Sequence, residues 1–420
     1  MAERASIIIS KFTIGDVDLL NDSPYVGFMV TLNEDINANF ITGTVVLSDS
    51  FGGINKSKFT GSEKIMIEFA ASPTPGAKKT FTGRVAGLPS RTNTRPGLVS
   101  ISLDIVSEDY LKNIKKLSKV FKGKHKDVIV QVYKEIGTSK LTIGKDLDAS
   151  QKTKVVVPYW HPFDLMNWLA ARTLSGDKAA NFYFYATLDG EHCFKSISSM
   201  MKDKQRPDIE YFDYGQLANY FSQDDEVGYK YPDDWRRVNS LDIYGNSLSF
   251  LRGNSKGSLG GILTQVNLSD KTYDKKKKEL SIKDLDSLGT HFGKTLKLED
   301  VPDEPYRRHH LVSPESFSDD SYTNDQADLA EKIVLQRNLA INVLKSTLAI
   351  EVHTAGLSSV KIGQTIKFNL LGPESHGGDQ IKIDQRINGD FIVCGIKHSF
   401  SSNNEYYTTF WIAKDAIEEP

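Results

Sequence analysis

The sequence predicts an α+β protein in which two similar small antiparallel β-barrels are joined by a helix-containing middle domain. Three observations support this class. Both ends of the chain alternate apolar and polar residues, helical periodicity is confined to the middle, and the two ends weakly repeat each other. We expect a first barrel at 1–106, an α+β middle domain at 107–205, a loop-rich insertion at 206–325 that contributes to the middle domain and the second barrel, and a helix with the second barrel at 326–420.

The first segment is predicted to contain strands only. Short runs rich in β-branched and aromatic residues are separated there by Gly, Pro, Asn and Asp clusters. Ile65, Ile67 and Phe69 alternate with Met66 and Glu68, which is typical of a half-buried strand. This density of short strands is typical of a small barrel or sandwich. The expected strands are 7–14, 25–32, 40–47, 64–69, 81–88 and 98–106.

Helical patterns begin at Ser107. We expect a polar helix from there to about Lys122, and a second helix that ends at Gly137. A third helix should begin at Pro162, because proline suits the first helical turn. Asp189-Gly190 then separates two strand-like runs, 182–188 and 192–197, and predicts a hairpin. The apolar faces of the second and third helices are Val128, Ile129, Val132 and Ile136, and Leu165, Met166, Leu169 and Ala170.

The insertion is expected to consist mainly of long loops, with candidate strands at 238–244 and 247–251. Gly-, Ser- and Lys-rich pieces lie at 253–261, 275–278 and 313–325. A helix is expected to begin at Thr323, which with Gln326 forms a capping box. The helix that follows should bury Ala330, Ile333, Val334, the stem of Arg337, Ile341 and Leu344, and strands are expected at 348–353, 365–370, 391–400 and 406–413.

The two β-rich ends resemble each other in three places. The glycine-led run from Gly61 to Phe69 matches the run from Gly363 to Leu370, with one residue skipped. Residues 81–88 match 390–396, and residues 103–109 match 410–415, in the same order along the chain. Short strands often look alike, so chance similarity is the alternative. If the repeat is real, one chain carries two copies of one barrel.

Composition excludes several classes of protein. The net charge of −2 over 420 residues argues against a global nucleic-acid-binding surface. No apolar run is long enough to span a bilayer, and the N-terminus lacks the apolar core of a signal peptide, so we expect the chain to fold in the cytoplasm. The two cysteines, Cys193 and Cys394, lie in strand-like apolar stretches and are expected to be buried free thiols, with a metal site or a redox pair as the alternative.

Two motifs with catalytic associations are expected to be coincidental. Gly253-Asn-Ser255-Lys-Gly257 matches a nucleophile elbow, but Ser258-Leu-Gly-Gly after it is a poor helix start. Gly289-Thr-His-Phe-Gly293-Lys294-Thr295 has three residues between its glycines, whereas a phosphate loop has four. We therefore expect no catalysis at Ser255 and no nucleotide site at 289–295.

The remaining polar clusters favour surface roles. His309 and His310 would point to opposite faces of a strand, so the Arg307-Arg308-His309-His310 segment is expected to be a solvated or subunit-contacting loop and not a metal site. The lysines at 275–278 have no interleaved aromatic residues, so we expect a solvated face there and not a nucleic-acid contact. No zinc, metalloprotease or calcium-loop motif occurs, so we expect no catalytic residue, cofactor or metal.

Several segments together resemble the baseplate hub family of contractile-tail phages, whose relatives include type VI secretion spike proteins and late-control tail proteins. Their order and spacing carry the resemblance, which spans most of the chain except about 201–320. The matching segments are Val157-Pro-Tyr-Trp-His-Pro-Phe-Asp-Leu-Met-Asn-Trp-Leu-Ala-Ala-Arg172 with the hairpin at Asp189-Gly190, Gly356 to Phe368, Gly389 to His398, Tyr407 to Asp415, and the helix around Arg337.

This resemblance implies a structural subunit of the virion tail baseplate. Three chains with two similar barrels each would form a ring of near six-fold symmetry, which adapts the tail tube or its initiator proteins to a central spike. Baseplate wedge proteins are further expected neighbours, and DNA would pass through the ring without specific binding. Because the sequence ends at Pro420 without a lysozyme domain or a long β-helix, we expect the spike to be a separate polypeptide.

Three other interpretations remain open from the sequence. The first is a tail-associated peptidoglycan or ester hydrolase that uses Ser255 or an unplaced carboxylate pair. The second is the hub of a bacterial contractile injection system. The third is a carbohydrate-binding module, although tryptophans are more often core or interface residues than sugar platforms. The tryptophans concerned are Trp160, Trp168, Trp235 and Trp411.

Overall fold

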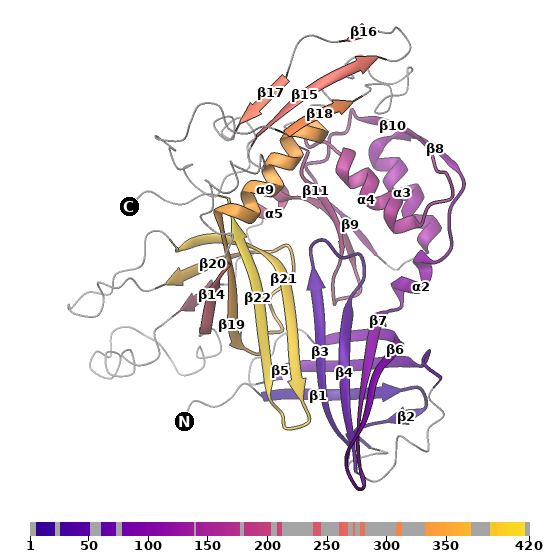
Figure 1. The fold of residues 1–420 in the computed structure, drawn as a ribbon, viewed down its shortest axis with the longest axis vertical. Coiled ribbons are helices and arrows are strands. Elements are labelled where there is room, and N and C mark those ends of the chain that lie inside the picture. Colours follow the sequence, from indigo (N-terminus) through magenta and orange to yellow (C-terminus); the bar gives the residue numbers. More distant parts are fainter. Residues whose placement is uncertain are drawn as a thin grey trace, which may run out of the picture.

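The computed structural model has a β-rich α+β fold, dominated by one large sheet with a smaller helical layer at one end (Figure 1). No helix among the described residues is long and apolar enough to cross a membrane. The structure describes residues 6–21, 26–50, 60–72, 78–137, 140–176, 180–202, 208–211, 238–244, 260–267, 272–273, 278–281, 308–312, 332–370 and 387–415.

The N-terminal part of the sheet contains the predicted strands. Their order across the sheet is β1-β5-β6-β7-β4-β3, with the short β2 beside β1, and every neighbouring pair is antiparallel. β6 is longer than predicted and forms a ribbon with β7 beyond the edge of β5. The strands are β1 (Ser6–Ile14), β2 (Val17–Asp18), β3 (Val26–Asp35), β4 (Thr42–Asp49), β5 (Lys64–Ser72), β6 (Lys79–Arg95) and β7 (Leu98–Ser107).

All six of the longer strands in this part contribute to one apolar core, which is the consequence of a sheet that curls around its inward side chains. Phe12, Val30, Val45, Phe69 and Leu103 lie within this core. Phe69 is fully buried, and complete burial of such a side chain contributes roughly 1.5–3 kcal/mol to stability.

The C-terminal part repeats this strand order. It runs β13-β20-β21-β22-β19-β14, so each strand takes the place of one N-terminal strand in the same chain order. One edge differs, because β13 is parallel to β20 whereas β1 is antiparallel to β5. The strands are β13 (Asp208–Tyr211), β14 (Val238–Ile243), β19 (Leu348–Ala355), β20 (Thr365–Leu370), β21 (Gly389–Ser401) and β22 (Tyr406–Lys414).

A β-bulge marks equivalent positions in the two parts. Pairing with the next strand shifts between Val85 and Gly87 in β6 and between Val393 and Gly395 in β21. The Val85 amide donates to the Glu63 carbonyl, and the Val393 amide donates to the Gln364 carbonyl, both at 2.9 Å. The repeat expected from the sequence therefore has a structural counterpart in strand order and in local geometry.

The two parts join edge to edge. The C-terminal half of β21 extends past β20 and pairs antiparallel with β3, from Gly395 opposite Asp35 to Ser401 opposite Met29. The amide of Ile36 continues this pairing by donating to the Cys394 carbonyl at 2.9 Å. We call this pairing the intrachain joint, because it turns the two curled sheets into one continuous sheet.

The helical layer agrees with the sequence at its second and third helices and at the hairpin. Gly137 ends α3 with a φ of +64°, and Pro162 opens α4. The first helix was predicted too long, since it ends at Asn113 and the chain then forms strand β8. The elements are α2 (Asp109–Asn113), β8 (Val120–Lys124), α3 (His125–Ile136), β9 (Leu141–Ile143), β10 (Lys152–Val156), α4 (Pro162–Arg172), β11 (Phe182–Ala186), β12 (His192–Ser196) and α5 (Ile197–Met201).

The helix near Arg337 buries only part of the predicted face and adds other residues to it. Val334 and Ile341 are half-buried, and Ala330 lies outside the described residues. A π-helical turn, η4 (Lys332–Gln336), precedes α9 (Arg337–Thr347) and changes the helical phase. Ile333 and Leu344 are buried as predicted, whereas Arg337 is half-buried and its guanidinium donates to the Phe182 carbonyl at 2.8 Å. The other buried residues are Leu335, Leu339, Ala340 and Val343.

The segment expected to be mainly loops contains strands. β15 (Gly260–Asn267) pairs with β16 (Thr272–Tyr273), β17 (Lys278–Ser281) and β18 (Arg308–Val312). The predicted loop at 307–310 is therefore wrong from Arg308 onward. The expected strand at 247–251 and the capping box at Thr323 lie outside the described residues.

Acid should destabilise the helical layer through His125. This side chain is fully buried, its Nε2 donates to Thr173 at 2.7 Å, and Thr153 contacts its Nδ1, so both nitrogens are satisfied by a neutral ring. Burial lowers the pKa of His125 to about 4 from 6.5, so between these values the unfolded chain binds a proton that the folded chain does not. The free energy of unfolding should fall by up to ~3 kcal/mol as pH drops through this window.

His125→Gln retains a donor and an acceptor but does not titrate. Urea unfolding between pH 7 and pH 4.5 should therefore show a shallower acid-induced loss for the variant than for the wild type. His192, whose pKa is also lowered by burial, keeps part of the slope in both. Equal slopes would contradict this account of His125.

Candidate functional site

One face of the large sheet points away from the two cores and extends across both parts of the chain. We call it the polar face, and define it by the outward side chains of β7, β4, β3, the Gly395–Ser401 half of β21, β22 and β19. Rows of side chains cross it from one part of the molecule to the other. One row runs Asp104, Thr44, Thr31, Ser399, Tyr407 and Ala355.

Few charges lie on the polar face. Serine and threonine dominate it, and its ionisable side chains are Asp35, Asp104, Glu351, Lys397 and His353. Three carboxylates against one lysine make the face weakly acidic. A surface of this kind offers little attraction to a polyanion, because affinity for phosphates comes mainly from lysine and arginine.

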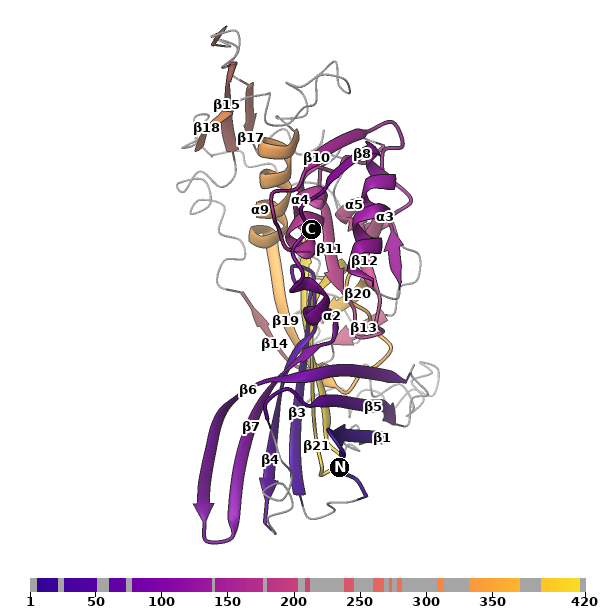
Figure 2. The same cartoon turned by 90° about the vertical axis from the view of Figure 1, so that its right-hand side faces the viewer.

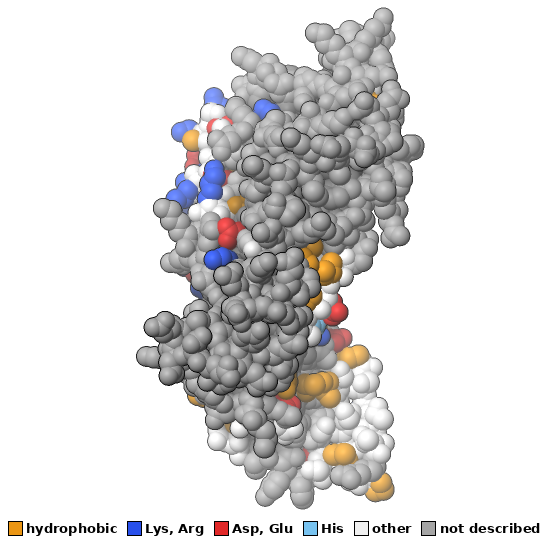
Figure 3. Space-filling view, turned by 90° about the vertical axis from the view of Figure 1, so that its left-hand side faces the viewer, with side chains coloured by type: hydrophobic (Ala, Val, Ile, Leu, Met, Phe, Trp, Pro, Cys, Tyr) orange, Lys and Arg blue, Asp and Glu red, His pale blue; other side chains and the backbone are white. Residues whose placement is uncertain are grey.

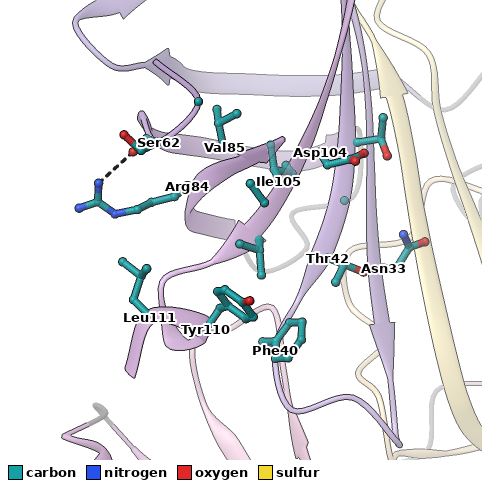
Figure 4. A pocket seen from close by; sticks show the side chains of 15 residues that line it. Asn33, Phe40, Thr42, Ser62, Arg84, Val85, Asp104, Ile105, Tyr110 and Leu111 are labelled. Carbon is teal, nitrogen blue, oxygen red and sulfur yellow. Dashed lines mark hydrogen bonds between the residues drawn. The ribbon is translucent and has the colours of Figure 1, made fainter. Parts of the chain in front are cut away.

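A hollow of about 660 Å³ lies where the polar face meets α2 (Figure 4). Phe40 and Tyr110 meet edge to face at its base, with ring centroids 5.3 Å apart. Arg84 on one side donates to the Ser62 carbonyl at 3.0 Å, and Asp104 stands apart from it on the sheet. Asp104 is the single carboxylate among the described lining residues, whereas glycoside hydrolysis uses a pair of carboxylates.

A buried polar cluster lies at the intrachain joint. His398 is fully buried, with Nε2 3.3 Å from the Glu34 carboxylate and Nδ1 2.8 Å from the Tyr406 hydroxyl. Glu34 also accepts a hydrogen bond from the Leu188 amide at 2.7 Å. The cluster links β3, β21, β22 and the β11–β12 hairpin, so it ties the joint to the helical layer.

A second charged cluster ties three segments together. The ammonium of Lys79 at the start of β6 lies 2.8 Å from Asp189 in the hairpin turn, and Lys361 before β20 lies 2.8 Å from the other carboxylate oxygen. Burial alone would raise the pKa of Asp189, but the two lysines outweigh it and hold the pKa below its ordinary value. Lys79 is 1% exposed, whereas Lys361 is 57% exposed, so Lys79 depends more strongly on Asp189.

Apart from the Asp189-Gly190 turn, most of the motifs noted in the sequence fall on residues that the structure does not describe. Ser255, residues 289–295, Arg307, the lysines at 275–277 and Trp235 lie outside the described residues. Cys193 and Cys394 are free, with Cys193 buried and Cys394 half-buried. Within the described part of the chain, no group of His, Cys, Asp and Glu side chains could hold a metal ion.

Trp160, Trp168 and Trp411 belong to packed regions. The first two rings pack against each other and against the core of the helical layer, and Arg172 stacks on Trp168 at 3.9 Å. Trp411 is half-buried on the polar face. The described tryptophans therefore fit packing roles better than a row of sugar platforms.

Two solved structures with a similar fold are tail proteins. The tail protein from Neisseria meningitidis MC58 superposes with a TM-score of 0.57 at 10% identity, over 99% of this chain and 98% of that one. The 43 kDa tail protein of prophage MuSo2 from Shewanella oneidensis gives a TM-score of 0.57 at 10% identity, over 98% of each chain. No family model and no curated protein sequence matches the chain.

Asp189→Asn should destabilise the fold more than loss of Lys361. The substitution leaves the Lys79 ammonium buried without a charged partner, which costs about 3 kcal/mol. Lys361→Met is the control and should cost under ~1 kcal/mol, because Lys361 is largely exposed. A third variant combines Lys79→Met with Asp189→Asn and should recover part of the stability that Asp189→Asn loses. Denaturant unfolding measures the free energy of unfolding of all three variants. Equal effects of Asp189→Asn and Lys361→Met would contradict the role given to Lys79.

Proposed function

We propose that this chain, which has the fold of these tail proteins, is a baseplate hub subunit of a contractile tail. Three copies form a ring of near six-fold symmetry that surrounds the DNA channel. The ring adapts the tail tube or its initiator proteins to a central spike, with baseplate wedge proteins as further neighbours. It assembles in the host cytoplasm and functions in the virion.

The observation that carries this proposal is the repeated strand order. Two curled sheets with the same order, joined edge to edge, give one chain two similar units in succession. A six-fold tube meets six such units when three chains close into a ring, while a three-fold spike meets three identical chains. Cyclic closure also removes exposed sheet edges, which otherwise promote aggregation.

The polar face supports a position at the channel wall. It runs without interruption across both parts of the chain, and the cores together with β1, β5 and β20 lie behind it. Its weakly acidic, hydroxyl-rich surface would let DNA slide, since each phosphate neutralised by a basic side chain adds affinity through counterion release.

A structural role is also favoured over hydrolysis. The hollow beside α2 has one described carboxylate, and the buried His398 already contacts Glu34 and Tyr406 inside the fold. His125 is likewise buried and paired with threonine hydroxyls. These histidines serve packing, and none of them lies beside the hollow.

The first test is the native mass. Each chain has a mass of 46.9 kDa, and the purified protein, alone or with its spike, should show three times this mass by native mass spectrometry. Electron microscopy of the same sample should show a ring with an opening. A monomer in both preparations would overturn the proposal.

The second test places positive charge on the polar face. Thr44→Lys, Ser399→Lys and Thr409→Lys together add three ammonium groups per chain to the proposed wall. Particles that carry this variant should release DNA at least tenfold more slowly at low salt, because the lysines bind passing phosphates. Raising the salt concentration should restore much of the rate.

Thr44→Gln, Ser399→Gln and Thr409→Gln together form the matched control, since glutamine occupies similar space without charge. This variant should release DNA at nearly the wild-type rate. If the lysine and glutamine variants release DNA equally fast, the polar face does not line the channel.

A further inference from the structure

We propose that the two-stranded β8–β10 sheet docks on the surface of an anionic lipid bilayer. Its outward face, which we call the lysine ribbon, carries lysines at one end and apolar side chains at the other. The inference goes beyond the proposed ring and applies to a single chain. The lysine ribbon consists of Val120, Lys122 and Lys124 of β8 and Lys152, Lys154 and Val156 of β10.

An antiparallel ladder places these side chains on one face. Each β8 residue of the lysine ribbon lies directly opposite a β10 residue of the same kind, so the valines form one pair and the lysines form two. Phe121 and Val155, which alternate with them, are buried in the core of the helical layer. Because directly opposite residues share a face of the ladder, four ammonium groups and two valine side chains point outward together.

Positive charge is concentrated in this part of the chain. Residues 109–156 contain twelve lysines and five carboxylates, whereas the whole chain has a net charge of −2. In Figure 3, the lysine and arginine side chains in view gather along the upper margin, and the lower part shows few. Like charges that lie opposite each other in a ladder repel, so an anionic surface laid across the two lysine pairs would relieve their repulsion.

The type of basic residue discriminates between anionic partners. Residues 109–156 contain no arginine. Arginine is enriched at protein interfaces, where lysine is depleted, and it is the preferred residue for recognition of nucleic acids. An anionic bilayer instead attracts lysine through a diffuse surface potential, which requires no fixed hydrogen-bond geometry. The composition therefore favours a lipid surface over an acidic protein or a nucleic acid.

The valine end supplies the apolar contact that bilayer binding also needs. Val120 is 59% exposed and Val156 is 65% exposed, and Tyr159 close by in the chain is 67% exposed. Tyrosine is enriched at membrane interfaces, because its ring is apolar and its hydroxyl can stay in contact with water. The valine end would enter the headgroup region while the lysines remain at the level of the phosphates.

The backbone fixes Tyr159 beside the lysine ribbon. Its φ is +60°, which is rare for a bulky residue. Leu117 and Trp160 exchange two backbone hydrogen bonds, 2.8 and 3.1 Å long, next to it. The Lys116 ammonium lies 5.1 Å from the centroid of the tyrosine ring. A side chain held in this way loses little further freedom on docking.

The lysine ribbon lies apart from the proposed channel wall. Figures 1 and 2 both show β8 and β10 in the helical layer at the upper end of the molecule, away from the N-terminal strands of the large sheet. Neither strand contributes to the polar face. Contact with a bilayer through β8 and β10 would therefore leave the polar face uncovered.

Vesicle flotation with the full-length protein tests the inference. Vesicles of phosphatidylglycerol and phosphatidylcholine in equal parts should bind the protein roughly tenfold or more tightly than vesicles of phosphatidylcholine alone. Raising the salt concentration should weaken this binding, because salt screens the attraction between the lysines and the headgroups. Equal binding to the two kinds of vesicle would overturn the inference.

Substitution of the four lysines locates the contact. The combined variant Lys122→Gln, Lys124→Gln, Lys152→Gln and Lys154→Gln should lose roughly tenfold or more of its affinity for the anionic vesicles. Arginine at the same four positions retains the charge and should bind as the wild type does. This second variant separates loss of charge from loss of fold, which thermal unfolding measures for both.

A matched control removes the same charge elsewhere. The combined variant Lys11→Gln, Lys64→Gln, Lys78→Gln and Lys367→Gln changes four exposed lysines in or beside the large sheet. It should bind the anionic vesicles nearly as tightly as the wild type. Equal losses in the two glutamine variants would show that net charge alone governs binding, and would contradict docking through the lysine ribbon.

Val120→Ser with Val156→Ser tests the apolar end. This variant keeps every lysine and should still bind anionic vesicles several-fold more weakly, because less apolar surface enters the bilayer. Duplex DNA and polyglutamate, as soluble polyanions, should bind more weakly than the vesicles and should not distinguish this variant from the wild type. Binding to either polymer without binding to vesicles would defeat the inference and indicate a nucleic acid or an acidic protein as the partner. A monomer that binds vesicles as expected would refute the proposed ring and leave this inference standing.

Discussion

The pairing of β3 with β21 is the contact on which the rest of the structure depends. It joins strands far apart in the sequence, and its register fixes which side chains of both parts enter the cores. A slip by one residue would turn His398 and Phe400 outward and bring Lys397 and Ser399 into the interior. The buried His398, held between Glu34 and Tyr406, opposes such a slip, because these polar groups satisfy each other only in the observed alignment.

The presence of strands could be predicted from the sequence, because the alternation of apolar and polar residues indicates which side chains are buried. Residues 64–69 and 101–105 formed strands as predicted, and the internal repeat pointed to the repeated strand order. Strand length was harder to predict, since residues 90–94 of β6 are polar and exposed, and their strand geometry comes from pairing with β7. The same limit applies to α9, where a π-helical turn changes the phase that a regular helix would keep.

The candidate surfaces could not be found by motif. Thr31, Thr44, Ser399 and Thr409 lie apart in the sequence and resemble ordinary solvent-facing strand residues, so only the joined sheet shows that they form one face. The Asp189 cluster was hidden for a related reason: the turn was predicted from Asp-Gly, but its two lysine partners come from other segments. Motifs that did attract attention, such as the one at Ser255, have no described counterpart in the fold.

Covalent continuity across the intrachain joint has a consequence for mass action. In the proposed ring, half of the contacts between units are formed within a chain, where the effective concentration of the two edges does not depend on how much protein the cell makes. Three encounters then complete a ring that would need six if every unit were separate. The amount of closed ring therefore depends on a lower power of the subunit concentration. A particle that needs only one such ring can form it even when the subunit is scarce.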